Sequence, residues 1–113
     1  MEYVGGGDLL NKINKCKRMN SYFPESQIWK YFIQLLRGLK ILHDAKIIHR
    51  DIKSANTFLS EDLKTIKLGD LNVAKVVKSN LAMTQVGTPL YISPEIWSNK
   101  AYDYKTDIWS LGC

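Results

Sequence analysis

Apolar residues recur at three- and four-residue steps in the first half of the chain, which is the spacing of a helix with a buried face. The strongest run begins near Pro24, a residue that suits a first helical turn. Trp29 and Ile33 widen the apolar stripe, so the pattern predicts a largely buried helix. The other residues of the stripe are Ile28, Phe32, Leu35, Leu36, Leu39 and Leu42.

A shorter helix is predicted ahead of it. The backbone is permissive from Gly5 to Gly7, and Asp8 can then cap a helix that carries Leu9, Leu10 and Ile13 on one side.

After Ala45 the pattern changes to short strand-like pieces. These are Ile47–Ile48, Thr57–Leu59 and Thr65–Leu68, the last with apolar and polar residues in alternation. The polar link Ser60–Lys64 reads as a hairpin connection.

A long stretch with little periodicity follows, from Asn72 to Tyr91. Loops of such length are usually functional or disordered. The segment from Asp103 to Cys113 then reads as the beginning of a further helix. The predicted order is therefore helix, two small hairpin-like pieces, a long loop and more helix, which is an α+β arrangement.

Composition supports a folded globular chain. Of the 113 residues, 45% are hydrophobic and 24% charged, so a real core is expected. No apolar run is long enough to span a bilayer and no signal peptide is visible, so we expect an intracellular protein without membrane partners. Cys16 and Cys113 lie far apart, which favours two free thiols over a disulfide or a zinc site.

The net charge is +5, and one small basic cluster stands out. It could contact anionic partners, but a solvated helix face is the favoured interpretation. A nucleic-acid binder would rest on this cluster alone, so no nucleic-acid partner is expected. The cluster consists of Lys12, Lys15, Lys17 and Arg18.

The richest chemistry lies in the string H-R-D-I-K-S-A-N at residues 49–56, on a predicted loop between two strands. Asp51 could accept or orient a hydroxyl proton, and Lys53 could neutralise a transferred phosphate. Asn56 could offer an oxygen to Mg²⁺, a hard cation. This set suits phosphoryl transfer, where catalysis consists mainly of positioning and charge neutralisation.

A second acidic element, Gly69-Asp70-Leu71-Asn72, follows the last predicted strand. Asp70 could supply a second metal ligand there. Either string alone could be a coincidence or a plain turn. Their order and the hairpin between them make chance improbable.

At these residues the chain strongly resembles the protein kinase family, whose catalytic loop reads H-R-D-x-x-x-x-N. The resemblance covers residues 1–113 as a partial kinase domain: hinge, catalytic loop, metal-binding loop, activation segment and the start of helix F. It implies a kinase-like α+β fold with a mainly helical C-lobe, short β-hairpins and no N-lobe.

The resemblance assigns roles to the motif residues. Asp51 and Lys53 match the catalytic pair, with Lys53 in the Ser/Thr-kinase pattern, while Asn56 and Asp70 match the Mg²⁺ ligands. It also implies ATP as cofactor and a protein as substrate. Around the adenine it places Glu2, Val4 and Phe58, with Met1 as gatekeeper.

Further roles follow from the second half of the chain. Thr88, in Gly87-Thr88-Pro89, would bond Asp51 and Lys53. Glu95, in Ser93-Pro94-Glu95, stands in the A-P-E position, and Asp107 would brace the catalytic-loop backbone.

Control by phosphorylation is also implied. Arg50 could pair with a phosphate on the long loop and order that segment. Thr84 is the favoured acceptor and Ser79 a weaker one, while the plain alternative is an unmodified loop hydroxyl.

Three strings together look most like NIMA-related kinases: M-E-Y-V-G-G-G-D-L, G-D-L-N-V-A-K and G-T-P-L-Y-I-S-P-E. By kinship alone this implies a cytoplasmic protein with centrosomal, ciliary or nuclear roles.

The chain departs from the family pattern in two respects. Asp70-Leu71-Asn72 replaces D-F-G, and Asn72 tolerates the unusual backbone angles that the glycine position often needs. By the resemblance, the Gly-rich phosphate loop, the ATP-contacting lysine, the helix-C glutamate and the Arg partner of Glu95 are not among these 113 residues, so we expect a fragment of a longer enzyme. The 113-residue chain alone is therefore expected to be nearly inert, and a truncated pseudokinase that acts as an interaction module is the alternative to a Ser/Thr kinase.

Overall fold

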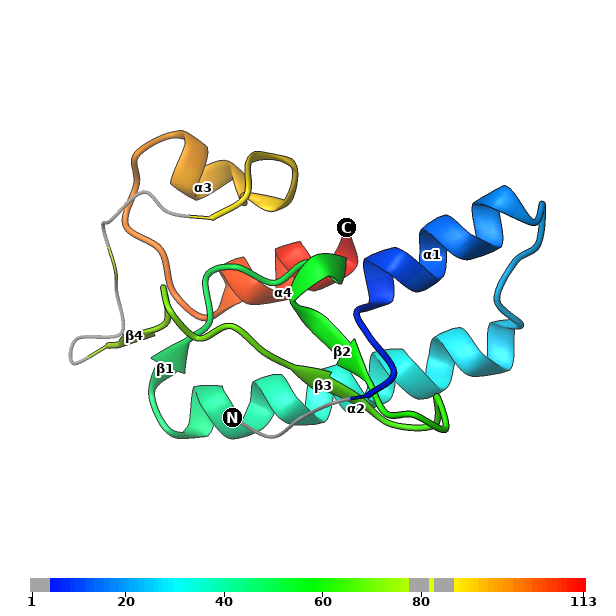
Figure 1. The fold of residues 1–113 in the computed structure, drawn as a ribbon. Helices are drawn as coiled ribbons and strands as arrows, with labels where there is room; N and C mark the ends of the chain where they lie inside the picture. Colours follow the sequence, from blue (N-terminus) through cyan, green and yellow to red (C-terminus); the bar gives the residue numbers. More distant parts are fainter. Residues whose placement is uncertain (1–4, 78–81, 83–86) are drawn as a thin grey trace. The chain divides into compact units, whose positions relative to one another are not determined.

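The computed structural model describes residues 5–77, 82 and 87–113 (Figure 1). Its helices are α1 (Leu9–Arg18), α2 (Glu25–Asp44), α3 (Pro94–Trp97) and α4 (Lys105–Gly112), with 3₁₀ turns η1 (Ser54–Asn56) and η2 (Pro89–Tyr91). Its strands are β1 (Ile47–Ile48), β2 (Thr57–Leu59), β3 (Ile66–Leu68) and β4 (Lys75–Val76). This mixture of helices and small antiparallel strand pairs confirms the predicted fold class. The chain forms two compact units, Met1–Gly38 with Ser54–Gly69, and Leu39–Lys53 with Asp70–Cys113.

In the first unit, α1 begins as predicted at the Asp8 cap. The Oδ1 atom of Asp8 accepts a hydrogen bond of 2.7 Å from the backbone N–H of Asn11, which satisfies one free donor of the first turn. Lys15, Lys17 and Arg18 stand in the last turn, where positive charge interacts favourably with the helix dipole. The helix packs beside η1 and β2.

The predicted hairpin is also present in the first unit. Strands β2 and β3 pair antiparallel, with Thr57 opposite Leu68 and Leu59 opposite Ile66. Asp62 shapes the connection between them, because its Oδ1 accepts from the Ser60 hydroxyl at 2.6 Å and from the Lys64 N–H at 3.0 Å. These two hydrogen bonds, the first above all, lower the pKa of Asp62.

Side chains in the first half of helix α2 form hydrogen bonds with the hairpin. The Tyr31 hydroxyl donates to the Leu63 carbonyl at 2.7 Å, and burial raises the pKa of this tyrosine. The Gln34 amide donates to the Lys64 carbonyl and accepts from the Ile66 N–H, both at 3.0 Å. These contacts tie the register of the hairpin to that of the helix.

The prediction that α2 is largely buried was wrong. Its buried apolar residues are Tyr31, Leu35 and Leu39, which are spaced by four and form one narrow stripe. The β2–β3 hairpin covers this helix, and a hairpin of three-residue strands is too small to cover a wide face. No helix in the described part of the chain is long and apolar enough to cross a membrane. The large apolar residues exposed on α2 are Ile28, Trp29, Ile33 and Ile41.

In the second unit, β1 pairs antiparallel with β4, a strand that the sequence did not predict. The Val77 N–H extends this pairing with a 2.8 Å hydrogen bond to the Lys46 carbonyl. Beside it lies a core cluster from segments far apart in sequence, and helices α3 and α4 follow it in the chain. The buried members of the cluster are Ile48, Val77, Ala82, Ile96 and Tyr102.

Candidate active site

The candidate catalytic groups of the second unit form a closed triangle of polar contacts. The Thr88 hydroxyl donates to Asp51 Oδ1 at 2.7 Å, and Lys53 Nζ donates to that same hydroxyl at 2.7 Å. Lys53 Nζ also lies 2.9 Å from Asp51 Oδ2, so one ammonium and one hydroxyl hold the carboxylate from two sides. The two contacts that the kinase resemblance implies for Thr88, with Asp51 and with Lys53, are therefore present, and the ion pair of Lys53 with Asp51 completes the triangle.

This triangle is neither buried nor fully exposed. The side chain of Lys53 is 23% exposed and that of Asp51 is 15% exposed. An ion pair in such a position is screened less than one on the open surface, while a substrate hydroxyl can still reach it. The arrangement can hold a hydroxyl by hydrogen bonding and place a positive charge beside it.

Asp107 fixes the backbone that carries Asp51. Its side chain is fully buried, and its oxygens accept from the backbone N–H groups of His49 and Arg50, each at 2.9 Å. His43 Nε2 lies 2.8 Å from Asp107 Oδ2 as a third partner. A buried carboxylate with three hydrogen-bond partners is well compensated, so it can serve as a rigid anchor for the loop.

Arg50 has a strained backbone that this anchor helps to hold. Its φ of 68° lies in the left-handed region, which costs a non-glycine residue about 1–3 kcal/mol. Its guanidinium donates to the Val73 carbonyl at 2.6 Å and to the Tyr102 hydroxyl at 3.2 Å. The backbone and the side chain of Arg50 are thus both held by the second unit.

Gly87 has a steric reason to be glycine. Its φ is 119°, and an added Cβ would lie 2.9 Å from the Arg50 carbonyl oxygen. Any other residue would push the backbone away and displace the neighbouring Thr88 hydroxyl from Asp51.

Tyr102 belongs to the site but was missed by sequence reasoning. It is buried, it donates and accepts backbone hydrogen bonds with Ala82 at 2.9 and 2.7 Å, and its hydroxyl accepts from Arg50. It thereby links one point of the long loop to the residue next to Asp51. An isolated bridge of one residue pair has no periodicity in the sequence, so local pattern gave no signal for Tyr102.

In the first unit, Asn56 directly precedes β2 and Phe58 is the middle residue of that strand. Asn56 is buried, and its carbonyl accepts from the Gly69 N–H at 2.9 Å. Phe58 pairs with Lys67 across the hairpin and forms an isolated bridge with Asp8. A Cβ on Gly69 would lie 2.5 Å from the Phe58 ring, so glycine lets this ring stay where it is.

Asp70 belongs to the second unit and is exposed, at the head of a short turn. It is Asp70, with φ 55°, that takes the left-handed backbone here, while Asn72 has no positive φ. The Asn72 N–H reaches back to Asp70 Oδ1 at 3.4 Å. Asparagine in place of glycine is therefore accommodated without strain at its own φ.

The oxygen donors at these positions suit Mg²⁺. Mg²⁺ prefers oxygen ligands and is usually held by one or two carboxylates together with substrate phosphates and waters. Asn56 offers an amide oxygen and Asp70 a carboxylate. Among the described residues no group of three His, Cys, Asp or Glu side chains could hold a metal. The role of Asn56 and Asp70 as Mg²⁺ ligands therefore stays a prediction from the motif.

Glu95 is half-buried in the first turn of α3. With Lys105, Ile108 and Trp109 it lines a hollow of about 600 Å³. Within the described residues it makes no ion pair with an arginine, so its structural role stays a prediction.

Five residues named from the sequence lie outside the described part of the chain. They are Met1, Glu2 and Val4 of the expected hinge, Thr84, the expected phosphorylation site, and Ser79, the weaker candidate acceptor.

Comparison with known proteins agrees with this geometry. The sequence model of the protein kinase domain matches residues 1–113, and the chain therefore belongs to the protein kinase domain family. It is 52% identical over 115 residues to the human serine/threonine-protein kinase Nek5, 51% to mouse Nek1 over 115 residues and 48% to mouse Nek3 over 115 residues. All of this chain is covered in each case, against 16%, 9% and 22% of those proteins. The predicted resemblance to NIMA-related kinases is confirmed, and the chain spans less than a quarter of the length of these relatives.

Proposed function

We propose that the protein to which this chain belongs is a Ser/Thr protein kinase that transfers the γ-phosphoryl group of ATP to protein hydroxyls with Mg²⁺. The observation that carries the proposal is the triangle of Asp51, Lys53 and Thr88, with contacts of 2.7, 2.7 and 2.9 Å. Membership of the protein kinase domain family and the Ser/Thr-kinase names of the relatives support it.

Each residue of the triangle has a role in this reaction. Asp51 accepts a hydrogen bond from the substrate hydroxyl, orients its oxygen and takes its proton as the bond to phosphorus forms. Lys53 neutralises the negative charge of the phosphoryl group in transfer. Thr88 keeps Lys53 and Asp51 in register and leaves carboxylate lone pairs for the substrate. The metal–nucleotide complex, when bound, supplies the phosphoryl group, with ADP as the leaving group.

The direct test is phosphate incorporation by the full-length protein into a mixture of Ser- and Thr-containing peptides, with ATP and either Mg²⁺ or EDTA. We expect incorporation that depends on Mg²⁺. Absence of both transfer and ATP binding would instead support a pseudokinase that acts as an interaction module.

Regulation by the long loop is part of the proposal. A phosphate on Thr84 would pair with the Arg50 guanidinium, which the second unit already orients through Val73 and Tyr102. Cytoplasmic location with centrosomal, ciliary or nuclear roles is proposed by kinship.

Replacement of Thr84 tests this regulation. In the full-length enzyme Thr84→Ala is expected to lower kcat about tenfold or more, because one to three charge-assisted hydrogen bonds to the loop are lost. Turnover is measured before and after phosphatase treatment, and Ser79→Ala, which removes the weaker candidate acceptor, is measured beside it and is expected to have the smaller effect. Unchanged turnover in Thr84→Ala would refute the regulatory role.

A further inference from the structure

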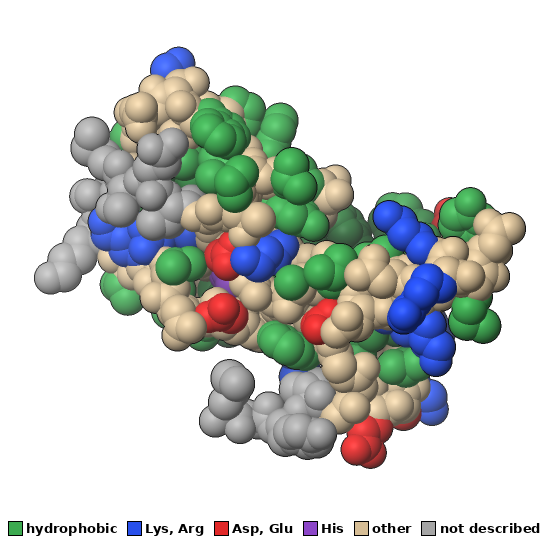
Figure 2. All heavy atoms as spheres, turned by 45° about the horizontal axis from the view of Figure 1, so that its top comes forward, with side chains coloured by type: hydrophobic (Ala, Val, Ile, Leu, Met, Phe, Trp, Pro, Cys, Tyr) green, Lys and Arg blue, Asp and Glu red, His purple; other side chains and the backbone are tan. Residues whose placement is uncertain are grey.

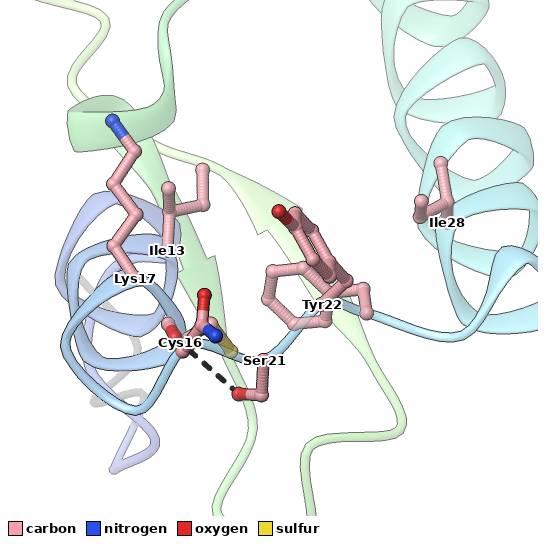
Figure 3. Close-up of a pocket in the computed structure, with 8 residues that line it drawn as sticks. Ile13, Cys16, Lys17, Ser21, Tyr22 and Ile28 are labelled. Carbon is pink, nitrogen blue, oxygen red and sulfur yellow. Dashed lines mark hydrogen bonds between the residues drawn. The ribbon is translucent and has the colours of Figure 1, made fainter.

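A preformed groove lies in the first unit, between the end of α1 and the first turns of α2 (Figure 3). Its volume is about 350 Å³, and apolar side chains from both helices face into it. The catalytic residues contribute nothing to its lining. Six of the residues that line it are Ile13, Cys16, Lys17, Ser21, Tyr22 and Ile28.

The walls of the groove are fixed by local hydrogen bonds and ring packing. Both the backbone N–H and the hydroxyl of Ser21 donate to the Cys16 carbonyl, at 2.9 and 3.4 Å. Phe23 packs edge-on against Tyr31, with ring centroids 6.2 Å apart. A partner would therefore meet a site whose shape is already made, which lowers the entropic cost of binding.

Large apolar side chains at the groove are exposed to solvent. Of the residues that line the groove, Tyr22 is 90% exposed and Ile28 is 53% exposed, and Met19, the C-cap of α1, is 67% exposed. Single exposed apolar residues are ordinary, but several around one hollow indicate an interaction surface. Tyrosine in such a place adds contact area at a small cost in side-chain entropy.

The charged residues of α1 beside the groove are basic. The basic cluster Lys12, Lys15, Lys17 and Arg18 lies on α1, and Figure 2 shows lysine and arginine side chains gathered over this part of the molecule. Across residues 12–28 the only carboxylate is Glu25, whose Oε1 accepts from the Trp29 ring N–H at 3.2 Å. The basic cluster of α1 therefore favours an anionic partner at this end of the groove.

We propose that this groove is a docking site for a short acidic peptide of a partner protein, with one bulky apolar side chain as its anchor. The anchor enters between Ile13 and Ile28 and packs against Tyr22. Asp or Glu residues beside the anchor lie next to Lys17 at the rim. The apolar hollow selects a bulky apolar side chain as the anchor. The basic residues in the last turn of α1 favour acidic residues beside it.

The experiment is a selection of random twelve-residue peptides displayed on phage against the full-length protein. The expected consensus is an aromatic or large aliphatic residue flanked by Asp and Glu. The best selected peptide is then synthesised with a fluorophore, and its Kd is measured by fluorescence anisotropy. Lys17→Glu and Tyr22→Ala are each expected to weaken it about tenfold, with Lys100→Glu, an exposed lysine of the second unit, as the unaffected control.

Three results would overturn the proposal. The first is the absence of any consensus, or a basic one. The second is a consensus that the Lys17→Glu and Tyr22→Ala double variant selects as well as the wild type does. The third is a single-stranded RNA of random sequence that binds the basic cluster of α1 and competes with the peptide, while neither ligand is weakened by Tyr22→Ala. That result would assign the face to nucleic acid.

Discussion

Asp51→Asn in the full-length enzyme is expected to lower kcat by roughly 10²- to 10⁴-fold, the usual contribution of a positioned general base. Asparagine keeps the shape of the side chain but cannot take a proton from the substrate hydroxyl. The KM for ATP should change little, because the substitution removes a group that acts on the acceptor. Steady-state kinetics with ATP and an acceptor peptide measures both quantities.

The control for this variant is Asp44→Asn. Asp44 is also paired with a lysine, Lys40 at 2.6 Å, but both side chains are largely exposed, so the pair contributes little. Its kcat should match the wild type. An Asp51→Asn enzyme with full turnover would remove Asp51 from the mechanism and leave the triangle as a structural feature only.

Asp107→Asn is expected to destabilise the catalytic domain by about 3 kcal/mol and to lower kcat as well. The buried side chain accepts from His49 and Arg50 and contacts His43, and an amide can accept at only one of its two ends. The NH₂ group of the asparagine would face an N–H donor that the carboxylate now accepts from, and neither donor would have an acceptor. Calorimetry of the full-length protein should show a lower Tm for the domain.

Hydrogen exchange separates the local effect of this change from a general one. The amide protons of His49 and Arg50 should exchange faster in Asp107→Asn under conditions where the rest of the domain stays folded. Asp103→Asn is the matched control, because Asp103 accepts only a local bond from the Lys105 N–H, at 2.8 Å. Unaltered exchange at both amides would contradict the role of Asp107 as the anchor of the loop.

Where periodicity or turn chemistry was strong, the sequence was sufficient to predict the fold. The Asp8 cap, the helix after Pro24 and the Ser60–Lys64 hairpin follow from local rules and are present in the structure. Helix α3 was missed because four residues are too short to show a helical period. Strand β4 was missed because its two residues, Lys75 and Val76, lie in the long stretch with little periodicity and lack the paired apolar residues that mark β1. The extent of burial on α2 was overestimated, because burial depends on the width of its covering and not on the stripe itself.

In the candidate site, too, local motifs could be predicted from the sequence and tertiary contacts could not. The motif 49–56 marks Asp51 and Lys53 by spacing, and the resemblance supplies Thr88 and Asp107. The contact of Tyr102 with Arg50 and the left-handed φ at Asp70 depend on tertiary structure. Local sequence carries no signal for either.

In the proposed reaction Asp51 directs phosphoryl transfer to Ser and Thr hydroxyls. This role is tested most directly with two peptides that differ only in Ser or Tyr at the acceptor position, offered to the full-length wild-type and Asp51→Asn proteins after both are shown to bind ATP. The wild type is expected to place Mg²⁺-dependent phosphate on the Ser peptide and little on the Tyr peptide, and Asp51→Asn almost none on either. Bound ATP with no transfer to either peptide, or equal transfer by both proteins, would contradict this role.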